Sequence, residues 1–370
     1  MITITVSCSI QRSPRVQQVE GLFDLASARK TELSWEVSLP LDERPWHVGL
    51  IVGPSGCGKS TIARRLWPAQ LAFEPAWPAD RAILDAFPEG LAIKDIVTLL
   101  SSVGFSSPPA WLRPFGVLSS GQQFRARLAV LLAACPDLAV MDEFTSTVDR
   151  TVAQIGAHAL AKTVRQRGQK FIAVTCHEDV QAWLNPDWVY RPDANAFTWR
   201  FLQRRPAIEL RICRVERQLW QIFKHHHYLS AALAPGAVCF AAFWERRMVA
   251  FSAWVPALTR RGGKREHRTV TLPDYQGVGI GHALSTHLAA MWKALGYRAA
   301  STTTHPAFIA ARQRSSHWRM VRPPSLARAK GRFRHATTRL TAGFEFIGPP
   351  LDTLAARKLL TGWQDDKMTR

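Results

Sequence analysis

Two loops of this sequence contain the residue types that bind phosphate groups, and they lie about 220 residues apart. The first, GPSGCGKS at positions 53–60, follows an apolar run and precedes a helical pattern. In such a loop the backbone N–H groups hold phosphates, the lysine contacts β- and γ-phosphate oxygens, and the hydroxyl after it ligates Mg²⁺. The predicted ATP-binding residues are Gly53, Ser55, Gly56, Gly58, Lys59, Ser60 and Thr61. The second loop, QGVGIG at 276–281, also opens a helix and has the glycine spacing of a pyrophosphate-binding loop.

Two carboxylates follow a short apolar strand that the sequence predicts at 138–141. We expect Asp142 to complete the Mg²⁺ site with Ser60, and Glu143 to orient and deprotonate the water that attacks ATP. Two further segments flank this strand. LSSGQ at 118–122 opens a helix whose N-terminal amides can bind an anion, and STVD at 146–149 follows the carboxylates.

These segments, in this order, make the first 200 residues resemble an ABC-type ATPase domain, with LSSGQ as the signature segment and STVD as the D-loop. The resemblance implies that the signature segment completes the ATP site of the opposite subunit, so that two chains form a head-to-tail homodimer. It also implies that His177, after a strand predicted at 170–175, contacts the γ-phosphate. The signature residues expected at ATP are Ser119, Gly121 and Gln122.

The chain departs from this family in two places. Ser120 occupies the position where the signature usually has a second glycine, and no glutamine lies between Gln70 and Gln122 to form the usual Q-loop. The adenine-stacking residue is predicted to be Phe23, and a phenylalanine packed in the core is the alternative interpretation.

The second loop belongs to a longer motif, LPDYQGVGIG at 272–281, which resembles motif A of the GNAT acetyltransferases. The resemblance implies a mixed sheet that splays beside this loop and holds acetyl-CoA or another acyl-CoA. The predicted acyl-CoA-binding residues are Gln276, Gly277, Val278, Gly279, Ile280 and Gly281. Near the preceding strand the carboxylates are Glu266 and Asp274. A lysine acceptor must lose a proton before it attacks, whereas the amine of a nucleobase is already neutral, so a site poor in carboxylates favours a nucleobase.

The segment HHHYLS at 225–230 contains three consecutive histidines, which point in different directions on a helix and cannot all ligate one metal. It resembles a segment of the phage Mom-type DNA-modification proteins, which are GNAT-like and modify adenine at its exocyclic amine. The resemblance nominates His227 and Tyr228 as acceptor-side catalytic residues.

The charge is concentrated in the second half of the chain. Residues 1–200 contain 20 Lys and Arg against 19 Asp and Glu, whereas residues 201–370 contain 28 against 9. A polyanionic partner for the second half is therefore favoured, and nucleic acid, DNA over RNA, is our prediction. The residues expected to contact it are Arg312, Arg314, Arg319, Arg322, Lys330, Arg332 and Arg334, which have Trp318 and Phe333 interleaved among them.

The alternation of predicted strands and helices indicates an α/β protein: a P-loop ABC-type ATPase domain followed by a GNAT-like mixed-sheet α/β domain. We place the first domain at 1–203, the second at 204–350 and a C-terminal helix or tail at 351–370. Helices are predicted at 121–134, 152–167, 214–224, 282–295, 306–314 and 351–360. Six scattered cysteines without a CxxC pair indicate a reducing, cytoplasmic setting, and no apolar run reaches the roughly 18 residues of a membrane span.

The sequence therefore predicts an ATP-hydrolysing protein, with Mg²⁺, fused to an acyl-CoA-dependent N-acyltransferase that acts on nucleic acid. Two alternatives remain. One is a protein or small-molecule N-acetyltransferase regulated by ATP, and the other is a non-catalytic, DNA-associated ABC ATPase.

Overall fold

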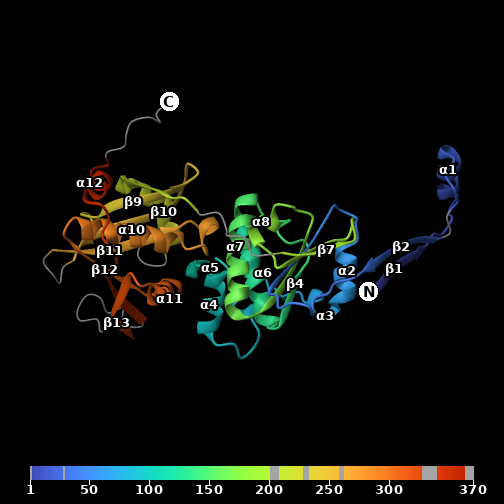
Figure 1. Ribbon diagram of the computed structural model, residues 1–370, viewed down its shortest axis with the longest axis horizontal. Coiled ribbons are helices and arrows are strands. Elements are labelled where there is room, and N and C mark those ends of the chain that lie inside the picture. Colours follow the sequence, from blue (N-terminus) through green and yellow to red (C-terminus); the bar gives the residue numbers. More distant parts are fainter. Residues whose placement is uncertain are drawn as a thin grey trace. The chain divides into compact units, whose positions relative to one another are not determined.

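The computed structural model describes residues 2–27, 30–200, 208–227, 233–257, 262–326 and 340–362 (Figure 1). The chain forms two compact units, and each consists of several segments. The first unit comprises Met1–Glu74, Cys135–Thr147 and Val164–Arg204. The second comprises Pro75–Ala134, Val148–Thr163 and Arg205–Arg370. The last change of unit falls after Arg204, and the second unit also includes two segments, Pro75–Ala134 and Val148–Thr163, that the sequence assigned to the ATPase. The predicted domain limits stay a prediction.

The first unit contains a five-stranded sheet in the order β4-β5-β3-β6-β7. Its strands are β3 (Val48–Val52), β4 (Leu138–Met141), β5 (Lys170–Thr175), β6 (Trp188–Arg191) and β7 (Ala196–Trp199). The first four are parallel and β7 is antiparallel to β6. The helices of this unit are α1 (Pro14–Phe23), α2 (Lys59–Leu66), α3 (Pro68–Leu71) and α8 (Val180–Leu184), and β1 (Ile2–Ser9) pairs with β2 (Lys30–Val37) in a separate ribbon.

Strand β3 is the centre of this sheet because all five of its residues, VGLIV, are buried. A continuous apolar run of this kind is typical of a parallel strand covered on both faces. Gly49 is needed within it because the ring of Trp188 on β6 lies where a side chain would be, 2.1 Å from an ideal Cβ. The start of β3 is fixed by Asp187, whose Oδ2 accepts hydrogen bonds from the N–H groups of His47 (2.9 Å) and Val48 (2.7 Å).

The first part of the second unit is helical. It contains α4 (Ile93–Ser102), α5 (Pro108–Trp111), α6 (Ser120–Ala134) and most of α7 (Arg150–Arg167), with the 3₁₀ turns η1 (Ile83–Ala86) and η2 (Phe115–Val117). Helices α6 and α7 approach closely because Gly156 leaves room for the ring of Phe124.

The rest of the second unit is a seven-stranded sheet in the order β13-β14-β12-β11-β10-β9-β8. The strands are β8 (Arg211–Val215), β9 (Val238–Trp244), β10 (Arg247–Pro256), β11 (Gly263–Thr271), β12 (Arg298–Thr303), β13 (Trp318–Leu326) and β14 (Leu340–Phe346). Neighbouring strands are antiparallel except β11 and β12, which are parallel. These two strands pair over three residues each, Gly263–Arg265 of β11 with Arg298–Ala300 of β12. The ladder between β10 and β11 shifts register where His267 is the extra residue on β11.

Helix α10 (Ile280–Ala294) packs on this sheet (Figure 1). Its apolar face forms the main core with β9, β10 and β14. Helix α12 (Thr353–Thr361) packs on α10 and β8, and Ala356 is fully buried in the same core. The predicted C-terminal helix is therefore part of this fold. The remaining elements are α9 (Trp220–Phe223), α11 (Pro306–Arg314) and the 3₁₀ turns η3 (Arg217–Leu219), η4 (Lys224–His226) and η5 (Pro273–Tyr275).

The helix predicted at 214–224 is wrong. The chain there continues β8 to Val215, where it pairs with Cys239 of β9, and only the four residues of α9 are α-helical. Pairing with a strand more than 20 residues away overrides the local helical pattern. Among the described residues no helix combines the length and apolarity that crossing a membrane requires.

Candidate functional site

The P-loop, the two carboxylates and His177 lie at one edge of the first unit's sheet. Strands β3, β4 and β5 are parallel, with Val52 opposite Thr175 and Met141 opposite Ala173. The P-loop follows β3, the carboxylates follow β4 and His177 follows β5. The carboxyl ends of parallel strands meet at one edge of a sheet, which is where ligands bind in open α/β folds. The topology therefore gathers three of the predicted segments at one site.

The backbone of the P-loop is shaped for anion binding. Gly56 (φ 83°) and Gly58 (φ 94°) both have the left-handed conformation, and Gly58 is the N-cap of α2. Alternating conformations of this kind point successive N–H groups into one concavity. The Nζ of Lys59 donates to the carbonyl of Pro54 (2.6 Å), so its ammonium group lies across the loop.

The turn after β4 holds Glu143 in an unusual backbone conformation. Glu143 (φ 51°) and Thr145 (φ 71°) are both left-handed although neither is glycine, a strained arrangement that is common at functional sites. The N–H of Glu143 donates to Asp142 Oδ1 (2.9 Å), and the hydroxyl of Ser146 donates to Glu143 Oε2 (2.6 Å). The Glu143 side chain is exposed and held by one hydroxyl. The oxygen donors of Ser60 and Asp142 are of the type that Mg²⁺ prefers.

The signature segment forms a capping box at the start of α6. The amide of Gln122 donates to Ser119 Oγ (3.4 Å), and the amide of Ser119 donates to Gln122 Oε1 (3.2 Å). Gly121 is buried, and an ideal Cβ there would lie 3.1 Å from Val152 of α7. The small residues therefore allow close packing beside the helix start.

Two residues beside the P-loop were not predicted from the sequence. The ring of Trp35 on β2 lies 2.5 Å from an ideal Cβ at Gly58, and Asp193 Oδ1 lies 2.9 Å from one at Gly53. Phe23, at the end of α1, has 71% of its surface exposed. Its adenine-stacking role stays a prediction, and the alternative of a core position does not hold. The pairing of β1 with β2 placed Trp35 at the loop, and no local motif indicated it.

The Gly-rich loop at 276–281 has the same alternation as the P-loop. Gly277 (φ 96°) and Gly279 (φ 95°) are left-handed, and Gly279 is the N-cap of α10. A pocket of about 320 Å³ opens at this loop. Its lining residues are His158, Lys162, Ile208, Leu210, Gly277, Val278, Gly279, Ile280 and Ala283.

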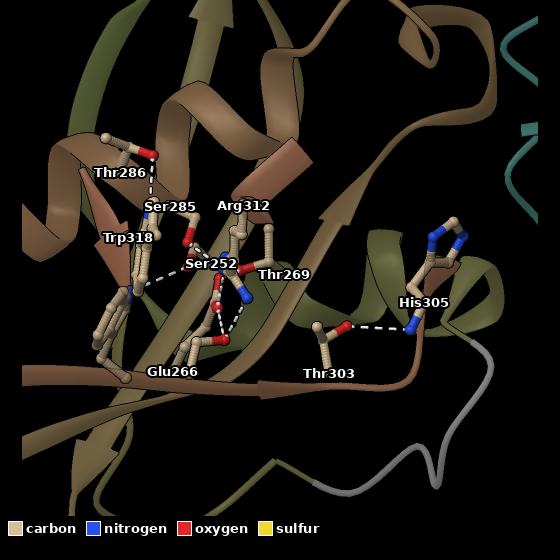
Figure 2. Close-up of polar contacts among 11 residues, drawn as sticks. Ser252, Glu266, Thr269, Ser285, Thr286, Thr303, His305, Arg312 and Trp318 are labelled. Atoms are coloured by element: carbon tan, nitrogen blue, oxygen red, sulfur yellow. Dashed lines mark hydrogen bonds and ion pairs between the residues drawn. The ribbon is translucent and has the colours of Figure 1, made fainter. Parts of the chain in front are cut away.

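Arg312, predicted to contact nucleic acid, is instead fully buried and cannot reach a phosphate group. Figure 2 shows its side chain among those of Glu266, Ser285 and Trp318. Its Nη2 donates to Glu266 Oε2 (2.6 Å) and to Ser285 Oγ (2.8 Å), and its Nη1 donates to Ser301 Oγ (2.6 Å). The guanidinium carbon lies 4.4 Å from the centre of the Trp318 ring. Arg312 therefore joins α11 to β11, α10 and β12, and we remove it from the nucleic-acid residues.

Glu266 is the carboxylate that the sequence placed near the acyl-transfer strand. Burial raises its pKa, but the charge of Arg312 and hydrogen bonds from Ser301, Thr269 and Arg312 outweigh burial and hold the pKa below its ordinary value. Because its oxygens are committed to these donors, Glu266 is a poor general base.

The remaining predicted residues are partly described. Arg314, Arg319 and Arg322 are exposed, although Arg319 donates to Glu345 (3.0 Å) and Arg322 to Thr341 (2.8 Å). His227 lies with its ring 5.8 Å from that of Trp220. Outside the described residues lie Tyr228, Lys330, Arg332 and Arg334.

No protein-family model matches this chain, and no curated protein matches it. Similar solved structures include cbiO1 of Clostridium perfringens, part of the ABC transporter complex cbiONQ, at 18% identity and a TM-score of 0.33 over 39% of this chain and 72% of that one. A dimeric ATP-binding cassette in a post-hydrolysis state with ADP and Pi is 18% identical, with a TM-score of 0.34 over 42% and 84%. A metal-chelate type ABC transporter in an inward-facing conformation is 16% identical, with a TM-score of 0.33 over 42% and 71%. These identities and TM-scores are too low to carry a function from those proteins to this chain.

Proposed function

We propose that this protein hydrolyses ATP at the carboxyl edge of β3, β4 and β5 and that its second unit transfers an acyl group from an acyl-CoA to nucleic acid. The observation that carries the ATPase proposal is the gathering of the P-loop, Asp142, Glu143 and His177 at the ends of three adjacent parallel strands. A glycine-rich turn that arose by chance would not place two carboxylates and a histidine on the neighbouring strands.

In this proposal each group has a distinct task. The P-loop amides and Lys59 bind the phosphates, while Ser60 and Asp142 would hold Mg²⁺, which would supply positive charge beside the phosphate oxygens. Glu143 accepts a proton from the attacking water, and the Ser146 hydroxyl fixes its orientation. His177, which follows β5 in the chain, contacts the γ-phosphate.

The arrangement of the second sheet supports acyl transfer. A mixed sheet with one parallel pair, β11 and β12, joined over only three residues fits the splayed sheet expected for a GNAT-like transferase. The Gly-rich loop follows β11 and its left-handed glycines lie at the start of α10, where N–H groups and the helix dipole favour a pyrophosphate. Lys162 in the adjoining pocket adds positive charge.

Two observations favour nucleic acid as the acceptor. The second half of the chain has a net charge of +19 (28 basic against 9 acidic residues), and exposed Arg314, Arg319 and Arg322 lie on α11 and β13. The ion pair between Glu266 and Arg312 removes a carboxylate that a lysine acceptor would need as its base. A nucleobase amine is neutral and needs no such base before attack. In a head-to-tail homodimer formed through the ATPase parts, each chain would contribute one transferase, so that two transferases could act on one nucleic acid.

The ATPase proposal is tested by Glu143→Gln, which keeps the size of the side chain but removes the base. We expect ATP turnover to fall by about 10²-fold or more while ATP binding is retained. Glu89→Gln, at an exposed glutamate distant in sequence from the motifs, is the matched control and should turn over ATP normally. Unchanged turnover in Glu143→Gln would show that another group activates the water.

The transferase proposal is tested by mass spectrometry of nucleosides from cells that express the protein. Gly279→Asp puts a carboxylate at the expected pyrophosphate position, and Gly296→Asp at the other end of α10 is the matched control. Both glycines are left-handed (φ 95° and 84°) with open space around them, so the backbone strain is the same. A modified nucleoside should appear with the wild type and Gly296→Asp but not with Gly279→Asp. If no nucleoside changes in any of them, nucleic acid is not the acceptor, and the two alternatives, a protein or small-molecule N-acetyltransferase and a non-catalytic, DNA-associated ATPase, are favoured.

A further inference from the structure

Within the second unit, the helix that begins with the signature segment contacts the chain just before the Gly-rich loop. Arg125, one turn into α6, donates from Nη2 to the carbonyl oxygen of Asp274 (2.9 Å). The carboxylate of Asp274 lies 3.5 Å from an ideal Cβ at Gly121, a residue of the signature segment. Asp274, two residues before Gln276, is therefore hydrogen-bonded to α6 through its backbone, and its side chain lies beside Gly121.

The Gly-rich loop is also held by the turn that follows α4. Gln276 Oε1 accepts from the amide of Ser106 (2.7 Å), and its Nε2 donates to the carbonyl of Thr271 at the end of β11 (2.9 Å). The backbones of Gly104 and Gly277 touch, since an ideal Cβ at Gly277 would lie 2.6 Å from the Gly104 Cα. The first residues of the loop thus pack directly on the backbone of the helical part.

These contacts are buried and involve charge. Arg125 is 1% exposed, and burial lowers its pKa to about 10, against the opposing effects of Asp274 and Asp149, so it stays protonated at neutral pH. Asp149 also caps α7 through the amides of Thr151 (2.9 Å) and Val152 (3.0 Å) and belongs to the D-loop. One buried cation therefore interacts electrostatically both with Asp149 of the D-loop and with Asp274, two residues before the Gly-rich loop.

We propose that Arg125 is a positioning residue that couples ATP engagement at the signature segment to acyl-CoA binding at the Gly-rich loop. This inference rests on the proposed function of both loops. Packed backbones are not compressible, so a displacement of the start of α6 displaces Asp274 and, with it, the amides that bind the pyrophosphate. Coupling of this kind is reciprocal: if ATP changes the affinity for acyl-CoA by some factor, acyl-CoA changes the affinity for ATP by the same factor.

The test is the dissociation constant of acetyl-CoA, measured by titration calorimetry on full-length Glu143→Gln protein with and without ATP and Mg²⁺. We expect the two constants to differ by about 5-fold or more. Adding Arg125→Met should bring their ratio close to one, because the thioether cannot donate to Asp274, whereas Arg125→Lys should retain part of it. Arg127→Met, an exposed arginine on the same helix, is the matched control and should leave the ratio unchanged.

Each outcome separates this inference from the proposed function. Acetyl-CoA that binds equally with and without ATP overturns the coupling and leaves the transferase proposal intact. If acetyl-CoA does not bind either with or without ATP, the assignment of acetyl-CoA as the acyl donor is wrong, and this inference fails with it. If Arg125→Met does not fold, Arg125→Lys decides, since a ratio of the two dissociation constants equal to that of the parent protein would overturn the role of Arg125.

Discussion

Replacement of Arg312 by methionine should strongly destabilise the second sheet. Methionine keeps an apolar chain against Trp318 but leaves Glu266 buried without its cation, with hydrogen bonds from Ser301 and Thr269 still in place. Removing one partner of a buried ion pair costs about 3–5 kcal/mol. At pH 7 we expect the free energy of unfolding to fall by an amount within this range and not above it. The loss is limited because Glu266 can take up a proton and so avoid a buried, unpaired charge.

The pH dependence gives a second measure of the same effect. In the wild type the pKa of Glu266 lies below its ordinary value of 4.5, so its contribution to stability is present above pH 4.5 and is lost as the pH falls through the lower folded value. Without Arg312, burial dominates and the folded pKa lies above the ordinary value. The variant therefore regains stability as the pH falls, and the difference in stability from the wild type should narrow between pH 7 and pH 5.5, by at most about 1.4 kcal/mol per pH unit.

The loss of stability can be measured in the full chain by hydrogen exchange of peptides from β11 and β12, with rates corrected for intrinsic exchange. A cost of 3–5 kcal/mol corresponds to exchange that is faster by about 10²- to 10³-fold or more. Arg319→Met is the matched control, because Arg319 pairs with Glu345 but is 61% exposed, and it should cost less than about 1 kcal/mol. Glu266→Gln combined with Arg312→Met should recover much of the loss. Equal effects of Arg312→Met and Arg319→Met, or no recovery in the double variant, would refute the reasoning.

Two further predictions concern the core of the first unit and the basic surface. Gly49→Ala should destabilise the first unit by about 1–3 kcal/mol in urea unfolding, because its Cβ would meet the buried ring of Trp188; Gly21→Ala, with nothing within 4 Å, should not destabilise it. Arg322→Gln should reduce the slope of log affinity for DNA against log salt by about one, measured by fluorescence anisotropy; an unchanged slope would exclude a phosphate contact by Arg322.

Local patterns predicted much of the fold. The helix predicted at 306–314 has the bounds of α11, and the strands predicted at 138–141 and 170–175 are β4 and β5. Each has a local signal: Pro306 at the start of a helix, and apolar runs that end at polar residues. The sequence predictions did not include β13 and β14. Strand β13 is an edge strand that contains Pro323 and Pro324, which obscure the alternation of a paired strand.

The site was less predictable where partners are distant in sequence. Arg312 belongs to a run of basic residues that looks like a surface, and its partner Glu266 lies 46 residues earlier. Trp35 reached the P-loop through the pairing of β1 with β2, which no spacing rule indicates. Residue type and spacing predict a loop that binds phosphate, but which cations are buried depends on the packing of elements that the sequence does not place.

The division of the chain also bears on how such a protein can change over evolution. The chain passes from one unit to the other five times, after residues 74, 134, 147, 163 and 204. A gene fragment that encoded only residues 204–370 would lack the backbone of Gly104, against which Gly277 packs. Recombination near residue 204 would therefore separate the Gly-rich loop from its support, so we expect the two halves to be inherited, and to change under selection, as one gene.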